Sequence, residues 1–345
     1  MQLTNRQCRL AARPEGLPKP SDWDFVDAAV AAIADGEFLV RVEYLSIDAA
    51  MRGWMTPVRS YIPPVEIGDV MRAAAMGRVI QSRHLDFQVG DYVNGAFGVQ
   101  EYAVSDGEGV RVVDLALGSP ATHLGVLGLS GLTAYFGILD VGKPQPGQTV
   151  VVSGAAGSVG SIAGQIARLQ ECRTIGIAGG PAKCDWLVKE LGFDAAIDYK
   201  SQNVRRQLRE LAPQGVDVFL DNVGGDVLDD VLVRLAPHAR VVISGAISQY
   251  NTTEGMRGPA NYMQLLVSRA SMTGFVIFDY AKRYREALTQ LAGWLDSGAL
   301  HAREDVVEAD IDDFPDVLLS LFRGANTGKL AMALPAALGN EGAVA

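Results

Sequence analysis

The stretch VVVSGAAGSVGSIAGQIARLQECRTIGIAGGPAKCDWL, from Val150 to Leu187, constrains the fold more than any other part of the chain. A strongly β-forming run leads into a glycine-rich turn and an amphipathic segment, and a second apolar run ends in Gly179 and Gly180. This order predicts the strand, turn, helix and parallel strand of a dinucleotide-binding βαβ unit. Taken alone, the motif could also be a tight turn that binds nothing.

The alternation of strands and helices continues on the C-terminal side of this unit. We predict strands at Thr149 to Ser153, Thr174 to Ala178, Ala195 to Asp198, Val216 to Asp221, Arg240 to Gly245 and Met272 to Phe278. Amphipathic stretches such as Asp185 to Leu191 and Val204 to Leu211 lie between them. Six strands with crossover helices predict an α/β fold with a doubly wound parallel sheet.

The rest of the chain predicts a second domain of a different kind. From about Gly36 to Ser105, short alternating apolar segments are broken by glycine and proline, which is typical of an antiparallel β domain. A chain of 345 residues exceeds the size of one ordinary hydrophobic core. The segment DVVEADIDDFPDVLLSLFRGANTGKLAMAL predicts strand, helix and strand returning to the β domain. We therefore expect one domain from residues 1–122 with 299–345, and another from 123–298.

Composition restricts the partners. The net charge is −10, and no cluster of Lys or Arg forms a phosphate-reading face, so a small molecule is expected rather than nucleic acid or an anionic membrane. The N-terminal residues lack a signal-peptide core, and no apolar run reaches the roughly 20 residues of a membrane helix. These features predict a cytoplasmic protein. Cys8, Cys172 and Cys184 are widely spaced and are interpreted as packing or surface thiols.

The glycine turn and the end of the second strand indicate which dinucleotide is bound. Gly157 and Gly160 take the last two glycine positions of the fingerprint, where the backbone must approach the pyrophosphate closely and helix amides face the phosphates. An NAD enzyme usually has Asp or Glu at the end of its second strand, where this chain has Gly179 and Gly180 followed by Lys183. We therefore predict NADP, with Lys183 on the 2′-phosphate. A solvated helix lysine is the alternative interpretation of Lys183.

The sequence predicts no metal. A zinc-dependent alcohol dehydrogenase would have a cysteine near the end of the early strand, where this chain has Ser46 and Asp48. The four histidines, His84, His123, His238 and His301, show no ligand spacing with one another or with cysteine.

A series of phrases in order carries a family resemblance over nearly the whole chain: YLSIDAAMRGWM, GLTAYFGILDVG, GAAGSVGSIAGQIARL, LGFDAAIDYK, DVFLDNVGGDVLDDVL, GAISQYN, GFVIFDY and GANTGKLAM. The sequence resembles the zinc-independent, NADPH-dependent double-bond reductases of the medium-chain dehydrogenase/reductase superfamily, among them prostaglandin reductases, plant alkenal reductases and bacterial curcumin reductase. The resemblance implies a Rossmann domain and a GroES-like antiparallel β domain.

The resemblance also implies a set of cofactor-binding residues. Its members are the pyrophosphate turn Gly157, Ser158, Val159 and Gly160; Lys183 and Tyr199 by the adenosine phosphate; Asn222, Ser244 and Tyr250 in the cofactor cleft; Phe275 and Val276 against the nicotinamide; and Asn326 from the other domain. Tyr262 matches the tyrosine that reaches the substrate carbonyl oxygen. Ala50 replaces a family tyrosine of the early substrate loop, so Arg52, Trp54 and Tyr61 are the remaining candidates to shape a different pocket.

The predicted chemistry is hydride transfer to an activated alkene. Without a metal, the negative charge that forms on the carbonyl oxygen must be stabilised by hydrogen-bond donors, and Tyr262 is the candidate donor. A tyrosine that merely packs is the alternative interpretation of Tyr262. A quinone reductase or a non-enzymatic NADPH-binding protein would share the glycine turn, and an alcohol dehydrogenase of secondary alcohols is disfavoured by the missing zinc ligands. The apolar run SMTGFVIFDY predicts an edge strand and a homodimer that pairs through it.

Overall fold

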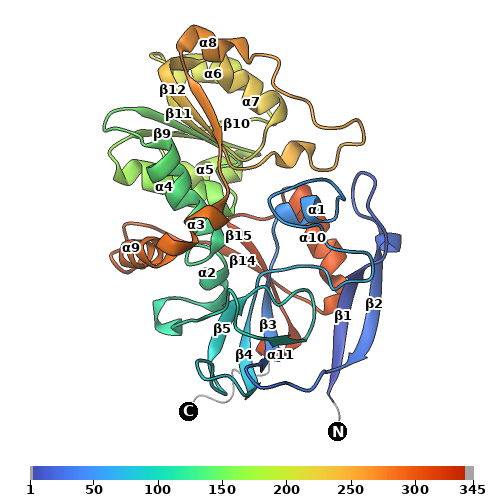
Figure 1. The fold of residues 1–345 in the computed structure, drawn as a ribbon. Coiled ribbons are helices and arrows are strands. Elements are labelled where there is room, and N and C mark those ends of the chain that lie inside the picture. The colour runs from blue at the N-terminus through green and yellow to red at the C-terminus, as the bar shows by residue number, and fades with distance from the viewer. Residues whose placement is uncertain (1–2, 339–345) are drawn as a thin grey trace. The chain divides into compact units, whose positions relative to one another are not determined.

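The computed structural model describes residues 3–338, and these form two compact units (Figure 1). The first unit contains the described residues up to Leu124 and those from Glu304 onward, and the second runs from Gly125 to Arg303.

The second unit is built on a parallel sheet in the order β10-β9-β8-β11-β12-β13. Its strands are β8 (Thr149–Ser153), β9 (Arg173–Ala178), β10 (Ala195–Asp198), β11 (Val216–Asp221), β12 (Leu235–Ile243) and β13 (Ser271–Gly274). Its helices are α3 (Leu129–Phe136), α4 (Ser158–Leu169), α5 (Pro181–Lys189), α6 (Val204–Leu211), α7 (Gly225–Leu232), α8 (Met263–Ser268) and α9 (Tyr284–Asp296). The strand order reverses between β8 and β11, which confirms the doubly wound prediction.

Helices cover both faces of this sheet, as Figure 1 shows. Strand residues alternate between the faces, so Val150 and Val152 pack with α3, α4 and α9, whereas Val151 packs with α6 and α7. Since both faces are buried, the strands read as continuous apolar runs instead of alternating ones.

The first unit contains a larger, mainly antiparallel sheet in the order β14-β15-β3-β4-β5-β7, with β6 also paired to β3. Its strands are β3 (Phe38–Ser46), β4 (Ala75–Ser82), β5 (Tyr92–Gly95), β6 (Tyr102–Ser105), β7 (Arg111–Val112), β14 (Glu304–Glu308) and β15 (Lys329–Ala333). Helices α1 (Ala50–Trp54), α2 (Pro120–Leu124), α10 (Phe314–Phe322) and α11 (Pro335–Leu338) accompany it. Because β15 pairs with β3, the last segment completes the sheet that the first segment begins.

Several details differ from the sequence predictions. An antiparallel hairpin, β1 (Thr4–Leu10) and β2 (Trp23–Ala29), precedes the first predicted strand, and β14 pairs with β15 in parallel. Helix α5 begins at Pro181, not Asp185, because Gly180 takes a φ of +96° and proline suits a first helical turn. Strand β12 begins at Leu235, and β13 ends at Gly274, since Ile277–Arg283 forms a 3₁₀ helix where strand was predicted.

No helix among residues 3–338 combines the length and the apolar character needed to cross a bilayer.

Candidate functional site

A tight glycine turn connects β8 to α4 at the carboxyl edge of the parallel sheet. Gly154 has a φ of +57°, and Gly157 takes the position before the first helical residue. A Cβ atom on Gly160 would lie 2.4 Å from the Gly154 carbonyl oxygen and 2.7 Å from Cα of Ala155. Because these are backbone atoms that cannot move aside, only glycine lets α4 start this close to the turn.

The turn leaves donors for an anion. The first N–H groups of a helix have no partner inside the helix, and α4 presents those of Ser158, Val159 and Gly160 there. The Ser158 hydroxyl is buried and finds no hydrogen-bond partner within residues 3–338. Buried polar atoms are nearly always paired, so this hydroxyl suits an acceptor from a bound molecule. A pyrophosphate group fits these donors and the space that glycine leaves.

The end of β9 is organised by a carboxylate from the next strand. Asp198, at the end of β10, accepts hydrogen bonds from the Gly180 amide at 2.7 Å, the Lys200 amide at 3.0 Å and the Ser201 hydroxyl at 2.7 Å. The Gly180 bond, followed by the Ser201 bond, lowers the pKa of Asp198 below its usual value. The sequence analysis missed this residue, although an acidic residue at a strand end was a usable signal.

The residues predicted to bind the adenosine phosphate surround this turn. A Cβ on Gly179 would lie 3.0 Å from the Tyr199 hydroxyl oxygen and 2.9 Å from Cε of Lys200. Lys183 lies in the first turn of α5, directly after Gly180. The structure therefore brings Tyr199 and Lys200 against a backbone with no side chain, and Lys183 follows within one helical turn.

Asn222 lies where the strand order reverses. Its Nδ2 donates to the Ser153 carbonyl oxygen at 2.7 Å, and its amide donates to the Ser153 hydroxyl at 2.9 Å. The Ser153 hydroxyl donates in turn to Asp221 at 2.6 Å. Burial raises the pKa of Asp221, while the hydrogen bonds from Ser153, Gly224 and Val223 oppose that rise. These bonds tie the ends of β8 and β11 together at the edge where open α/β sheets bind ligands.

Ser244 and Tyr250 belong to the loop that follows β12. The Ser244 amide donates to the Asp221 carbonyl oxygen at 2.8 Å, so this residue lies beside Asn222. The Tyr250 hydroxyl accepts from the Ala246 amide at 3.1 Å, and a Cβ on Gly245 would lie 3.0 Å from the hydroxyl oxygen. Tyr250 therefore folds its loop back onto the edge that carries Asn222.

Phe275, Val276 and Tyr262 lie elsewhere in the second unit. Phe275 and Val276 follow β13, and the Phe275 ring packs near Gly137 and edge-on to Tyr280 at 6.3 Å between centroids. Tyr262 precedes α8 and is 58% exposed. The neighbouring Asn261 amide donates to Asp229 of α7 at 2.8 Å, so the hydrogen bonds at this point anchor the chain to α7 and not to the turns after β8 and β11.

The remaining predicted residues belong to the first unit. Asn326 is buried, and its Nδ2 donates to the Gly328 carbonyl oxygen at 2.9 Å. Arg52 is 4% exposed, and its guanidinium donates to the Pro14 and Gly16 carbonyl oxygens and to Thr56 at 2.9 to 3.0 Å. Burial lowers the pKa of Arg52. Its donors hold the chain's own backbone, which makes it a support of the loop that it was predicted to line.

Trp54 and Tyr61 lie on the same segment as Arg52. The Arg72 guanidinium carbon lies 5.7 Å from the centroid of the Trp54 ring, and Arg72 donates to the Pro63 carbonyl oxygen at 2.9 Å. Arg13 donates to the Met55 carbonyl oxygen at 3.1 Å. Tyr61 is 55% exposed. Side chains from outside the segment thus fix its backbone, while an aromatic ring remains available on its surface.

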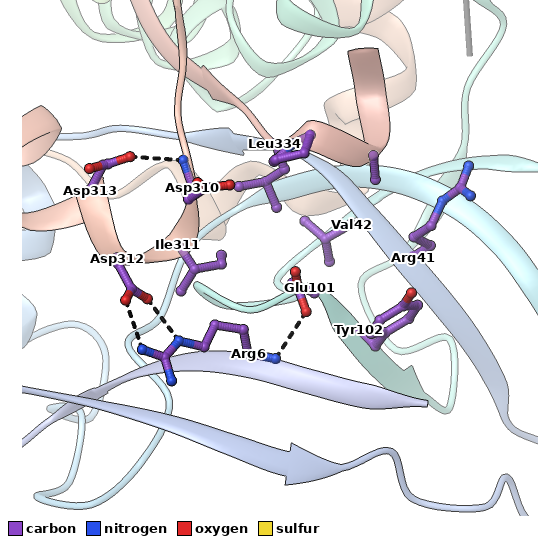
Figure 2. A pocket seen from close by; sticks show the side chains of 12 residues that line it. Arg6, Arg41, Val42, Glu101, Tyr102, Asp310, Ile311, Asp312, Asp313 and Leu334 are labelled. Atoms are coloured by element: carbon purple, nitrogen blue, oxygen red, sulfur yellow. Dashed lines mark hydrogen bonds and ion pairs between the residues drawn. The ribbon is translucent and has the colours of Figure 1, made fainter. Parts of the chain in front are cut away.

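A cavity of about 350 Å³ lies in the first unit, away from the predicted residues (Figure 2). Arg6 crosses it and donates to both carboxylate oxygens of Asp312 at 2.8 and 2.7 Å, and the Arg6 amide donates to Glu101 at 3.1 Å. The hydrogen bond with Arg6 lowers the pKa of Asp312. The charges of this cavity satisfy one another, so it carries no catalytic arrangement.

The titratable sulfur and imidazole groups form no reactive cluster in the part of the chain that the structure describes. Burial raises the pKa of the Cys172 and Cys184 thiols to about 11, which keeps both protonated at neutral pH. No group of three or more His, Cys, Asp or Glu side chains that could hold a metal ion is found among residues 3–338.

The fold and the phosphate turn define an α/β protein of the dinucleotide-binding class, and comparison with known proteins specifies the family. A model described as the N-terminal domain of oxidoreductase matches residues 6–113, and one described as zinc-binding dehydrogenase matches residues 158–293. The chain belongs to the zinc-independent medium-chain dehydrogenase/reductase family, whose members related to it are NADP-dependent oxidoreductases.

Individual relatives match over nearly their whole length. The NADPH-dependent curcumin reductase of Escherichia coli is 39% identical over 95% of this chain and 96% of its own. The NADP(+)-dependent 2-alkenal reductase of Nicotiana tabacum is 34% identical over 95% of this chain and 97% of its own. The crystal structure of CurA from Vibrio vulnificus in complex with NADPH is 41% identical, with a TM-score of 0.89 over 95% of this chain and 99% of that one.

Proposed function

We propose that the protein uses NADPH to reduce the carbon–carbon double bond of α,β-unsaturated ketones and aldehydes. The observation that carries this proposal is the full-length similarity to two reductases named for such substrates, curcumin and 2-alkenals. The protein is an oxidoreductase of this NADP-dependent family, and the choice of substrate and the roles of single residues are the parts to be tested.

The second unit holds the cofactor in this proposal. Amides at the start of α4 and the Ser158 hydroxyl bind the pyrophosphate, with Gly157, Val159 and Gly160 shaping the turn. Lys183 and Tyr199 bind the 2′-phosphate, which no carboxylate at the end of β9 repels. Asn222, Ser244, Tyr250, Phe275 and Val276 line the rest of the site, and Asn326 contributes from the first unit. Bound NADPH supplies a hydride.

Tyr262 is the proposed catalytic donor. The hydride adds to the β carbon, the π electrons of the double bond shift toward the carbonyl oxygen, and an enolate forms. The Tyr262 hydroxyl donates a hydrogen bond to that oxygen and stabilises its charge, since no metal ligand set is available to do so. Water protonates the α carbon, which balances the reaction.

The substrate segment is proposed to present Trp54 and Tyr61 to the alkene, with Arg52 holding their backbone in place. An aromatic surface suits the flat, conjugated substrates that such a reductase reduces.

A homodimer and a cytoplasmic location complete the proposal. Strand β13 lies at the sheet edge with every residue exposed, and Leu266 and Val267 of α8 beside it are 69% and 64% exposed. Unpaired edges and apolar patches of this kind favour pairing with a second copy. Sedimentation equilibrium should give a dimer, and a monomer at micromolar concentration would contradict the proposal. Imaging of a tagged protein tests the location.

A substrate panel separates this function from its alternatives. NADPH oxidation would be followed with an enal, a long-chain enone, a quinone and a saturated ketone, with NADH in parallel. Turnover of the enal or enone supports the proposal, turnover of the quinone alone supports a quinone reductase, and NADPH binding without turnover supports a binding protein.

The same assay tests Tyr262. Removing a hydrogen-bond donor of this type lowers kcat about 100-fold, so Tyr262→Phe should do so with unchanged NADPH affinity. Tyr102→Phe, at a partly buried tyrosine of the first unit, is the matched control and should keep full activity. Full activity of Tyr262→Phe would mean that the tyrosine only packs.

A further inference from the structure

Lys329 is a buried lysine that the proposed mechanism does not use. It is the first residue of β15 and is 2% exposed. Its Nζ donates to Oδ1 of Asp48 at 2.7 Å and to the Ile47 carbonyl oxygen at 3.1 Å. The ammonium therefore binds the chain at the point where β3 ends.

Asp48 passes this constraint to α1. Its second carboxylate oxygen accepts a short hydrogen bond from the Ser46 hydroxyl. Its carbonyl oxygen accepts the Met51 amide at 3.0 Å, which closes the first turn leading into α1. Since α1 is five residues long and ends at Trp54, the direction of its first turn decides where the Trp54 ring lies.

The other end of the constraint lies beside Asn326. The segment from Asn326 to Lys329 is short, and the Asn326 side chain closes it by donating to the Gly328 carbonyl oxygen. Gly328 has a φ of +77°, which fixes a sharp bend directly before Lys329. A proposed cofactor residue and a proposed substrate residue are thus joined through one ion pair within the first unit.

Stability does not require a charge at this point. Burying an ammonium and a carboxylate is expensive, and apolar side chains of similar volume often replace such pairs without loss of stability. What the pair adds is direction, since two hydrogen bonds from one nitrogen fix the Ile47–Asp48 peptide and carboxylate together.

We propose that Lys329 is a positioning residue that sets α1, and with it Trp54, relative to Asn326. The inference rests on the proposed function, in which Trp54 contacts the alkene and Asn326 the cofactor. Lys329 acts through Asp48 and touches neither ligand.

The test separates position from stability. Lys329→Met leaves the Asp48 charge without its partner, so it should lower the melting temperature and raise the KM for the enone about tenfold, since displacements near 1 Å have effects of up to about 100-fold. The double variant Asp48→Leu with Lys329→Met removes both charges and should recover the melting temperature. We expect it to keep the raised KM for the enone, with the Kd for NADPH changed less than twofold.

Arg41→Met is the matched control. Arg41 pairs with the buried carboxylate of Glu43 at 2.9 Å on the same strand β3, distant from α1. This variant should lose stability and keep the native KM. Recovery of the native KM in the double variant would overturn the proposal and leave Lys329 with a structural role. If the native protein reduces no enone, the proposed function fails instead, and NADPH titration still shows whether the cofactor site is intact.

Discussion

The phosphate turn of the second unit and the substrate segment of the first unit, residues 48–72, are held in place by different means. The turn is set by backbone: glycines at Gly154, Gly157 and Gly160, and amides at the start of α4. The substrate segment is set by long side chains from outside or across it, chiefly Arg13, Arg52, Arg72 and Lys329, which donate to its carbonyl oxygens or hold its aromatic ring.

This difference separates a constant function from a variable one. A backbone-built turn reads a pyrophosphate, which is identical in every dinucleotide. A segment fixed by side chains can be reshaped by single substitutions, such as Ala50 in place of the tyrosine that the family resemblance implies there. Changes to the two regions should therefore fail in different ways.

The largest expected effect is on the side-chain scaffold. Arg52→Met leaves the Pro14 and Gly16 carbonyl oxygens without their donor, and each buried carbonyl so exposed lowers the free energy of unfolding by about 1–3 kcal/mol. Denaturant unfolding measures this loss. Arg59→Met, at an exposed arginine of the same segment, is the control and should change little. Equal stability of the two variants would show that the arginine does not hold the segment.

The backbone-built turn should respond in binding. Gly160→Val places a Cβ against the Gly154 carbonyl, and overpacking of about 1–3 kcal/mol would weaken NADPH about 10- to 100-fold. Cofactor fluorescence titration gives the Kd. Gly293→Val is the control, because a Cβ on that exposed helix residue meets nothing within 4 Å. Native NADPH affinity in Gly160→Val would contradict the assignment of the turn.

The preference for NADPH over NADH should depend on Lys183. Loss of one charge-assisted hydrogen bond at a partly exposed site corresponds to about a tenfold change, so Lys183→Ala should reduce the ratio of the two affinities by that factor. Lys189→Ala removes a lysine of the same helix that pairs with Asp185, and it should leave the ratio unchanged. If the two variants behave alike, Lys183 is a solvated helix residue.

The smallest effect concerns Asp198 and pH. Its pKa lies below the usual 3.8 because the Gly180 amide, and then the Ser201 hydroxyl, donate to the carboxylate. A lowered pKa contributes stability that is present above the unfolded-state value and is lost as the pH falls through the folded-state value. Asp198→Asn should therefore lower the free energy of unfolding by about 1 kcal/mol at neutral pH, and less below pH 3.8. A difference that grows in acid would exclude this role.

The sequence predicted the parallel sheet well because its signals are local. The strands at Thr149–Ser153, Ala195–Asp198 and Val216–Asp221 have their predicted bounds, and the turn between β8 and α4 follows from glycine spacing. Edge strand β13 is shorter than predicted because Phe275 and Val276 leave the sheet, although their β-branched and aromatic character suits a strand.

The side-chain scaffold could not be predicted from the sequence. Lys329 and Asp48 are 281 positions apart, and Arg52 and Pro14 are 38 apart, so only the folded sheet brings them together. Asp198 was overlooked because its partner Gly180 lies on the neighbouring strand's turn. Tyr262 was assigned by resemblance, and its surroundings in α7 and α8 add no local signal for a hydroxyl donor.

The most direct test of the central claim follows the hydride itself. NADPH deuterated at the transferable position of the nicotinamide C4 would be incubated with a long-chain enone, and the product analysed by NMR. The account predicts a saturated ketone with deuterium on the β carbon and solvent hydrogen on the α carbon. Deuterium on the former carbonyl carbon, in an allylic alcohol, or an enone recovered unchanged while a quinone is reduced, would contradict it.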